Sequence, residues 1–205
     1  MPFLKQQIQL VNDALRAGAL ADSRFQNGRY EAIAVDVSRI NEGDRVETFP
    51  AIMNDNYEPV EVVVNDTYPV VIYHKILSKR YQVAQGSNFG DNNKAMVELV
   101  EAKMVVYGKY AALRLTTEEL EAVIASGFPD VIAKSKLAPY KIDSMNVTLQ
   151  SSNYNAAQVF QEEYKGFELF LSAEDIFFSV RYSIESRYRK GCFTICDCHG
   201  SVTGS

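Results

Sequence analysis

The chain has 205 residues, of which 47% are hydrophobic and 23% charged, the composition of a globular protein rather than of a disordered or fibrous one. Its formal charge of −5 at pH 7 argues against a protein that binds nucleic acid by neutralising many phosphates. Its apolar runs fall far short of the roughly twenty residues that span a bilayer, and residues 1–20 lack the pattern of a secretion signal. We therefore expect no membrane partner and a cytoplasmic location.

The N-terminal part is predicted to contain one helix and two strands. The apolar spacing within residues 3–20 predicts an amphipathic helix, and the alternation over Tyr30–Val37 predicts a strand. A second strand is predicted over Val46–Met53. Because Pro50 cannot donate to a sheet ladder, we expect this strand at a sheet edge, or the proline at a strand start. The apolar stripe of the helix consists of Leu4, Ile8, Val11 and Leu15.

The following segment is predicted to project from the domain. Valines alternate with other residues before Asn65-Asp66-Thr67, which predicts a β-hairpin over Tyr57–Tyr73 with its turn at these three residues. Residues 85–93 are rich in Gly, Ser and Asn, which favour turns, so we expect an exposed loop there. We interpret residues 57–93 as a hairpin and loop insertion.

The remaining elements alternate between strands and helices. Thr116 and Glu119 have the spacing of a capping box, which predicts a helix that begins there and ends near Gly127. A short helix is predicted over Asn155–Tyr164. Alternating apolar and polar residues predict the strands, which span Met96–Tyr110, Lys141–Gln150 and Ile176–Tyr188.

Together these elements predict one α+β domain over residues 1–190, followed by a C-terminal tail over residues 191–205. The fold is expected to be predominantly antiparallel sheet, with two or three helices packed on one side and a projecting β-hairpin. The twelve tyrosines and eleven phenylalanines favour sheet. The last strand is longer than usual, and its polar face suits a surface that meets solvent or a neighbouring subunit.

All three cysteines and one of the two histidines lie close together in the tail. Three thiols and an imidazole could complete a tetrahedral zinc site. Structural zinc sites usually take ligand pairs from two separate segments, so the crowded spacing argues against a metal here. The alternative is a polar tail with free thiols in a reducing compartment, and we expect no cofactor. The zinc candidates are Cys192, Cys196, Cys198 and His199.

The sequence carries no arrangement typical of catalysis, and we do not expect an enzyme. His74 ends an apolar strand, where a structural role is the more common one. No Ser or Cys stands in a G-x-S-x-G context, and the phosphate-binding glycine motifs are absent. The carboxylates pair as Glu98 with Glu101 on opposite strand faces, and as Glu162 with Glu163 at adjacent helix positions. Because neither pair converges, we interpret all four as solvated charge.

Two groups of charged residues are candidates for contacts with other proteins. One group follows the predicted hairpin, and the other lies on the polar face of the last strand. For the second group a solubilising role is an equal alternative, because charges on exposed strands discourage aggregation. The candidate interaction residues are Lys75, Lys79, Arg80, Arg181, Glu185 and Arg187.

The order of the predicted elements resembles that of tail-terminator, or tail-completion, proteins of long-tailed bacteriophages. An amphipathic helix precedes a strand with Phe49-Pro50-Ala51-Ile52, a long strand, a capped helix ending at Gly127-Phe128-Pro129, a strand, a short helix and a long last strand. The resemblance covers Phe3–Glu185. It implies an α+β subunit that assembles as a ring, commonly a hexamer, which stops tail-tube growth and joins the tail to the head. Neck and head-tail connector proteins of other types have similar size and composition.

We therefore expect a structural virion protein that assembles in the host cytoplasm and acts through contacts with its own copies and with other tail or neck proteins. Long strands with usable edges suit a ring built by extending sheets between subunits. An acidic lumen would let DNA pass without sticking, because like charges repel. The alternatives are a monomeric β-rich ligand-binding module, for which the tyrosines offer stacking surfaces, and a small zinc-stabilised domain.

Overall fold

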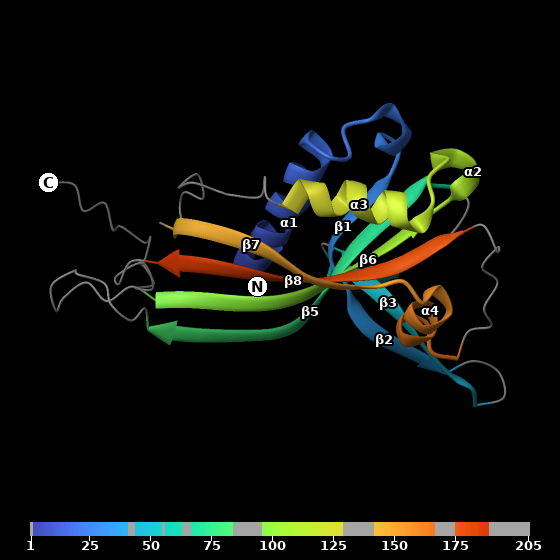
Figure 1. Cartoon of the computed structure of the whole chain (residues 1–205). Helices are drawn as coiled ribbons and strands as arrows, with labels where there is room; N and C mark the ends of the chain where they lie inside the picture. The colour runs from blue at the N-terminus through green and yellow to red at the C-terminus, as the bar shows by residue number, and fades with distance from the viewer. Residues whose placement is uncertain are drawn as a thin grey trace, which may run out of the picture.

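Two β-sheets and four α-helices make up the described part of the chain (Figure 1). The computed structural model describes residues 2–40, 44–54, 56–62, 67–83, 96–128, 142–166 and 175–188. The large sheet contains, in spatial order, β1 (Arg29–Ile33), β5 (Val70–Val83), β6 (Met96–Gly108), β8 (Ile176–Tyr188) and β7 (Ile142–Asn153). The small sheet contains β2 (Val35–Ile40), β3 (Val46–Met53) and β4 (Pro59–Glu61).

All strand pairs are antiparallel except β1 with β5. The expected α+β fold with predominantly antiparallel sheet is therefore confirmed. The central strand β6 is apolar on both faces around Met104 and Val105, and both side chains are fully buried. A strand that is covered on both sides reads as a continuous apolar run, which explains why β6 lies in the middle of the sheet.

One face of the large sheet packs against α1 (Pro2–Ala17) and α3 (Thr117–Gly127), and we call it the helix face. The 3-10 helix η1 (Ser23–Phe25) and the short helix α2 (Tyr110–Leu113) close the same core through Phe25 and Leu113. A side chain at Gly127 would place its Cβ 2.7 Å from Leu15 Cδ2, so glycine allows the end of α3 to approach α1. The predicted stripe of α1 is buried in this core, as Leu4, Ile8, Val11 and Leu15.

The opposite face packs against the small sheet and α4 (Ala156–Glu163), and we call it the small-sheet face. Its core joins the aromatic rings of Tyr73 and Phe177 on the large sheet to Phe49 on β3 and Phe160 on α4. Phe160 meets Phe177 edge to face at 5.5 Å between centroids, a favourable aromatic geometry. Two helices thus share one face, as expected, while α4 covers the other.

The predicted projecting hairpin over Tyr57–Tyr73 is wrong. β4 pairs with β3 in the small sheet, whereas β5 pairs with β6 and β1 in the large sheet. The two segments therefore belong to different layers, and β5 is part of the large sheet rather than of an excursion. The hydrophobic alternation was compatible with both arrangements, because periodicity identifies strands but not their partners. The predicted loop at 85–93 lies outside the described residues.

The strands flanking this crossover also differ from expectation. The predicted strand Tyr30–Val37 is split at Ala34, where the chain passes from the large sheet to the small one and the Ala34 N–H donates to the His74 carbonyl at 2.7 Å. β3 is the central strand of its sheet, so the edge placement inferred from Pro50 is wrong. The Pro50 carbonyl accepts from the Val62 N–H. The ring nitrogen of Pro50 faces the same side of β3 as this carbonyl. Because that position lies just past the end of β4, the missing N–H interrupts no β3–β4 pair.

The elements of the C-terminal half are confirmed closely. The capping box is present, because the Thr116 hydroxyl accepts from the Glu119 N–H at 3.2 Å and the Glu119 carboxylate accepts from the Thr116 N–H at 2.8 Å. β8 spans the predicted residues Ile176–Tyr188. α4 and β7 agree with their predicted positions to within a few residues.

The capping box yields a direct stability prediction. We expect Thr116→Ala to lower the free energy of unfolding by about 1 kcal/mol, because the Glu119 N–H loses its acceptor at the start of α3. Urea unfolding followed by circular dichroism measures the change. Thr117→Ala is the matched control, since this neighbour lies at the first helical position and makes no capping bond. Equal loss in both variants would contradict a specific capping role.

Candidate functional site

The four long strands of the large sheet extend beyond the small sheet and α4 (Figure 1). They run there in five rows without a bulge, each row holding one residue from every strand. We call this region the arm. The arm consists of Ser78–Gln82 of β5, Val97–Glu101 of β6, Ser183–Arg187 of β8 and Ser144–Thr148 of β7. In the described part of the chain, no helix or strand covers its small-sheet face (Figure 1).

All six predicted interaction residues lie in the arm or in the row of Lys75, Lys103 and Arg181, which the row of Ile76, Ala102 and Tyr182 separates from the arm. The side chain of Lys79 points to the other face, because a bulge between Ile76 and Ser78 turns it onto the helix face. There it forms an ion pair with the buried carboxylate of Glu98. The structure thus brings most of the predicted residues onto one surface. The residues on the small-sheet face are Lys75, Arg80, Arg181, Glu185 and Arg187.

The first row beyond the arm whose side chains point to the small-sheet face holds three basic residues. Lys75, Lys103 and Arg181 stand directly opposite one another on β5, β6 and β8. Like charges at directly opposed positions destabilise a sheet. Arg181 reaches solvent, but Lys103 is 9% exposed, so the two lysines require a counter-charge within the protein.

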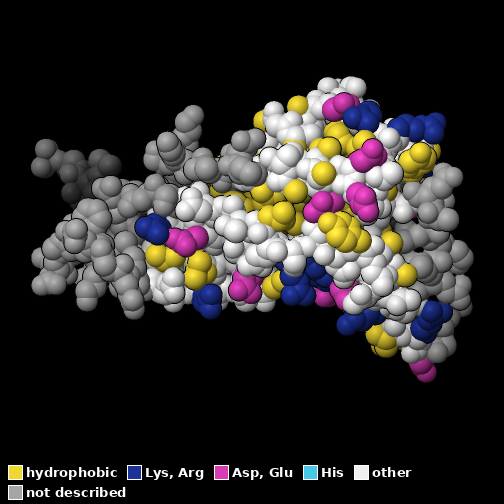
Figure 2. All heavy atoms as spheres, viewed as in Figure 1, with side chains coloured by type: hydrophobic (Ala, Val, Ile, Leu, Met, Phe, Trp, Pro, Cys, Tyr) yellow, Lys and Arg dark blue, Asp and Glu magenta, His cyan; other side chains and the backbone are white. Residues whose placement is uncertain are grey.

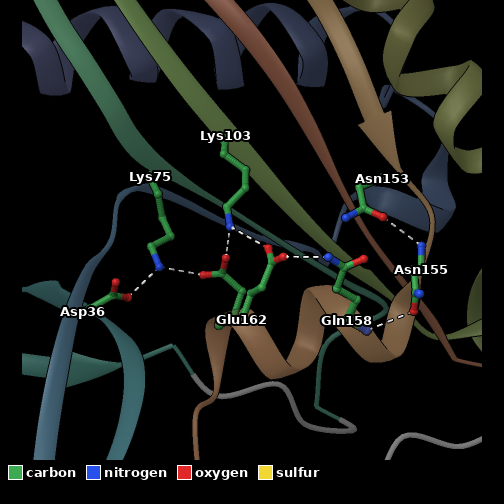
Figure 3. A network of polar contacts seen from close by, with 8 residues as sticks. Asp36, Lys75, Lys103, Asn153, Asn155, Gln158 and Glu162 are labelled. Carbon is green, nitrogen blue, oxygen red and sulfur yellow. Dashed lines mark hydrogen bonds and ion pairs between the residues drawn. The ribbon is translucent and has the colours of Figure 1, made fainter.

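Glu163 of α4 supplies this counter-charge with a fully buried side chain. Its Oε2 lies 2.8 Å from Lys75 Nζ, and its Oε1 accepts from Lys103 Nζ. Lys75 also donates to Asp36 of β2 at 2.5 Å, and Glu162 lies 3.8 Å from Lys103 Nζ. Figure 3 shows both lysines extending from the large sheet towards α4. One carboxylate therefore joins α4 to two strands of the large sheet.

The network keeps Lys75 charged despite its burial. Burial alone would lower the pKa of Lys75, but hydrogen bonds to Asp36 and Glu163 outweigh it and raise the pKa above its usual 10.5. A buried charge is tolerated only when it is paired and hydrogen-bonded. The cluster thus attaches α4 to the large sheet through paired charges, and these groups do not act as free acids and bases.

The interpretation of Glu163 as solvated charge is wrong, and a sequence signal for its burial existed. The Asn155 side chain accepts from the Gln158 N–H at 3.0 Å and starts α4. From there Val159, Phe160 and Glu163 recur at the three-to-four spacing of one helix face, and all three are buried. A carboxylate on the apolar face of a helix indicates a buried cationic partner, which Lys103 of the central strand provides.

A second buried carboxylate holds α1 on the helix face of the arm. Glu98, 1% exposed, accepts from Gln7 Nε2 at 3.2 Å and pairs with Lys79. The same Gln7 amide donates to Ser186 Oγ at 2.8 Å. The interpretation of Glu98 as solvated charge is therefore also wrong, although it does lie on the face opposite Glu101.

His74 belongs to a buried polar chain on the helix face. The Asn12 side-chain NH₂ donates to the Glu31 carbonyl at 3.0 Å, which leaves its Oδ1 as acceptor for His74 Nε2 at 2.8 Å. His74 Nδ1 is then unprotonated and accepts from the Tyr182 hydroxyl at 2.7 Å. Burial lowers the pKa of His74 to about 3. The imidazole is neutral and fully engaged, as expected of a structural histidine.

The described residues offer little support for a metal site, a membrane-spanning helix or a charged patch. The zinc candidates Cys192, Cys196, Cys198 and His199 lie outside them. Within them, no group of three His, Cys, Asp or Glu side chains could hold a metal ion. No helix among these residues is long and apolar enough to cross a membrane. In the view of Figure 2, acidic and basic side chains are interspersed, and neither sign forms a continuous patch.

No protein-family model matches the sequence, and no curated protein matches it. The function is therefore inferred from the geometry of the arm and of the charged row on the same face.

The Glu163 cluster predicts a large effect of a small substitution. We expect Glu163→Gln to lower the free energy of unfolding by about 3 kcal/mol, because it leaves Lys75 and Lys103 without their shared counter-charge. Glu162→Gln on the neighbouring, half-exposed position is the control and should change stability by less than about 0.5 kcal/mol. Denaturant unfolding of both variants measures this. Similar effects would show that the buried position confers no special role.

His74 predicts a pH dependence whose sign follows from its burial. The imidazole has a pKa of about 3 in the fold and 6.5 when unperturbed. Between these values only the unfolded chain binds the proton, so stability is complete above pH 6.5 and falls as the pH drops towards 3. Relative to His74→Gln, the natural protein should lose about 1.4 kcal/mol per pH unit in this window. If the free energies of unfolding of the two proteins changed equally with pH across this range, the assignment would be refuted.

Proposed function

We propose that this protein is a structural assembly subunit: a ring-forming tail terminator or head-tail joining protein of a virion, acting through contacts with its own copies and with other tail or neck proteins. The observation that carries the proposal is the arm. It is a four-stranded extension of the large sheet, with a polar face that no described element covers and with two strand edges that no described strand pairs.

The arm is built as a firm surface rather than as a loose extension. α1 covers its helix face, and the Gln7, Glu98 and Ser186 contacts fix that cover from within. Its small-sheet face carries Arg80, which is exposed and forms no ion pair with the described residues. An ordered polar sheet with free basic groups suits recognition of another protein through charge and hydrogen-bond complementarity.

The ionisable groups that are buried support a structural role. Glu163 neutralises two lysines, Glu98 neutralises Lys79, and His74 is held neutral between Asn12 and Tyr182. The contacts of Glu163 and His74 join elements that are distant in sequence, whereas Glu98 and Lys79 join the consecutive strands β5 and β6. These groups attach α1 and α4 to the large sheet and join strands within it.

The order of elements that carries the family resemblance is present in the chain. The elements named in the resemblance occur in that order as α1, β3, β6, α3, β7, α4 and β8, with β1, β2, β4, β5 and α2 between them. This order supports the choice of a tail-terminator or connector role among the many roles open to assembly subunits. A ring also suits a lumen through which DNA passes without tight binding, given the net charge of −5.

The mass of the protein in solution tests the proposal. We expect native mass spectrometry and light scattering to find a closed oligomer, with six copies favoured, whose mass does not change on moderate dilution. Negative-stain electron microscopy should then show rings. A monomer of 23.0 kDa at every concentration would overturn the proposal and would favour the ligand-binding alternative.

A further inference from the structure

We propose that copies of this chain join head to tail, by pairing the β7 edge of one arm with the β5 edge of the next arm in a continuous sheet. This inference rests on the proposed function, since it specifies how the assembly forms. It identifies the partner of both edges as a second copy of the same chain.

Both edges are open over the same stretch of the arm. β1 pairs with β5 only as far as His74, so Ser78–Gln82 has no strand on its outer side among the described residues. β7 is the last described strand on the other side of the sheet, and no described strand pairs with the outer side of Ser144–Thr148. Each open edge therefore presents a row of backbone N–H and C=O groups that a further strand can satisfy.

The two edges lie at the same level of the sheet. The row through Arg80 continues through Leu99 and Glu185 to Asn146. The rows on either side are equally regular, because the bulges of β5 and β7 fall outside the arm. A second copy can consequently be placed beside the first without a shift along the strands. A head-to-tail contact closes into a ring when the rotation between copies closes, and a contact without a shift along the strands is compatible with such closure.

Strand direction favours the same arrangement. β5, β6, β8 and β7 alternate in direction across the arm, because each neighbouring pair is antiparallel. β7 of one copy and β5 of the next, equally oriented copy therefore run in opposite directions. Pairing them continues the antiparallel alternation of the arm, and antiparallel pairing is slightly the more stable per residue.

The side chains at the two edges are compatible in this register. On the helix face, the buried Met145 of β7 would lie beside Tyr81 of the next copy, which is 50% exposed in the single chain. On the small-sheet face, the exposed amide of Asn146 would lie beside the exposed guanidinium of Arg80. In the next row on the helix face, Val147 would lie beside Lys79 of the next copy, whose charge is paired with Glu98. Polar groups thus meet on the small-sheet face, and apolar, aromatic and paired charged groups meet on the helix face.

The β7 edge lacks the residues that usually prevent an exposed edge strand from pairing with another chain. Natural edge strands are commonly blocked by lysine, proline or inward-pointing charges. The segment 144–153 contains no charged residue and no proline. Two bulges flank its regular part, and they limit pairing to the arm rather than preventing it. An open edge of this composition is expected to be covered by a partner strand in the working protein.

A charge-reversal set of variants tests the pairing. Asn146→Lys places a second cation opposite Arg80 of the next copy, and we expect it to raise the dissociation constant of the oligomer about fivefold. Combining it with Arg80→Glu should restore assembly. Gln150→Lys is the matched control, because this exposed position is on the same strand but outside the arm. Circular dichroism confirms that each variant is folded.

Disulfide trapping provides a second, independent test. In a full-length protein with Cys192, Cys196 and Cys198 replaced by serine, the pair Arg80→Cys and Asn146→Cys should form a ladder of cross-linked chains. The pair Arg80→Cys and Ser183→Cys should not, because Ser183 lies on an interior strand. Asn146→Cys alone should remain uncross-linked, since a head-to-tail contact never brings two copies of β7 together.

The outcomes separate this inference from the proposed function. An oligomer that is unaffected by Asn146→Lys and that gives no ladder would overturn the edge pairing and leave the assembly role intact. Self-cross-linking of Asn146→Cys would overturn it in favour of a two-fold contact. A natural protein that is monomeric throughout would overturn the proposed function itself.

Discussion

Three cations in one row of a β-sheet are tolerated here because a buried carboxylate meets two of them, and the arrangement of the whole molecule depends on that contact. Glu163 carries the end of α4 to Lys75 and Lys103, and Lys75 reaches on to Asp36 of the small sheet. Helix, small sheet and large sheet thus meet at one charged point. On the far side of this point the large sheet continues without that cover, as the arm (Figure 1).

The two faces of the arm have opposite characters for a physical reason. On the helix face, Glu98 and Gln7 join β6 to α1, so that face is sealed and its strands are held in register. On the other face, polar residues alternate outward along β8 and β7, as antiparallel strands with one wet side require. The result is an ordered sheet with one face and two edges that no described element covers, a geometry suited to extension by further strands.

Much of the fold followed from the sequence because its signals are local. The Thr116 and Glu119 capping box, the stripe of α1 and the alternation of β8 each lie within one element, and each was found where predicted. The pairing of strands did not follow, because alternation reports a strand but not its neighbour. The predicted charged residues were brought together at the arm, whereas Glu163 was missed since its burial depends on lysines 60 and 88 residues away.

Amide hydrogen exchange at the β7 edge tests the central claim most directly, because it reports whether backbone groups of the arm find partners. Exchange should be measured on the assembled protein and compared between Ser144–Thr148 and the interior segment Ser183–Arg187. The account predicts that both segments are protected to a similar degree, since the β7 edge is then an interior strand of a larger sheet. Rapid exchange of the β7 segment in an assembled oligomer would contradict it.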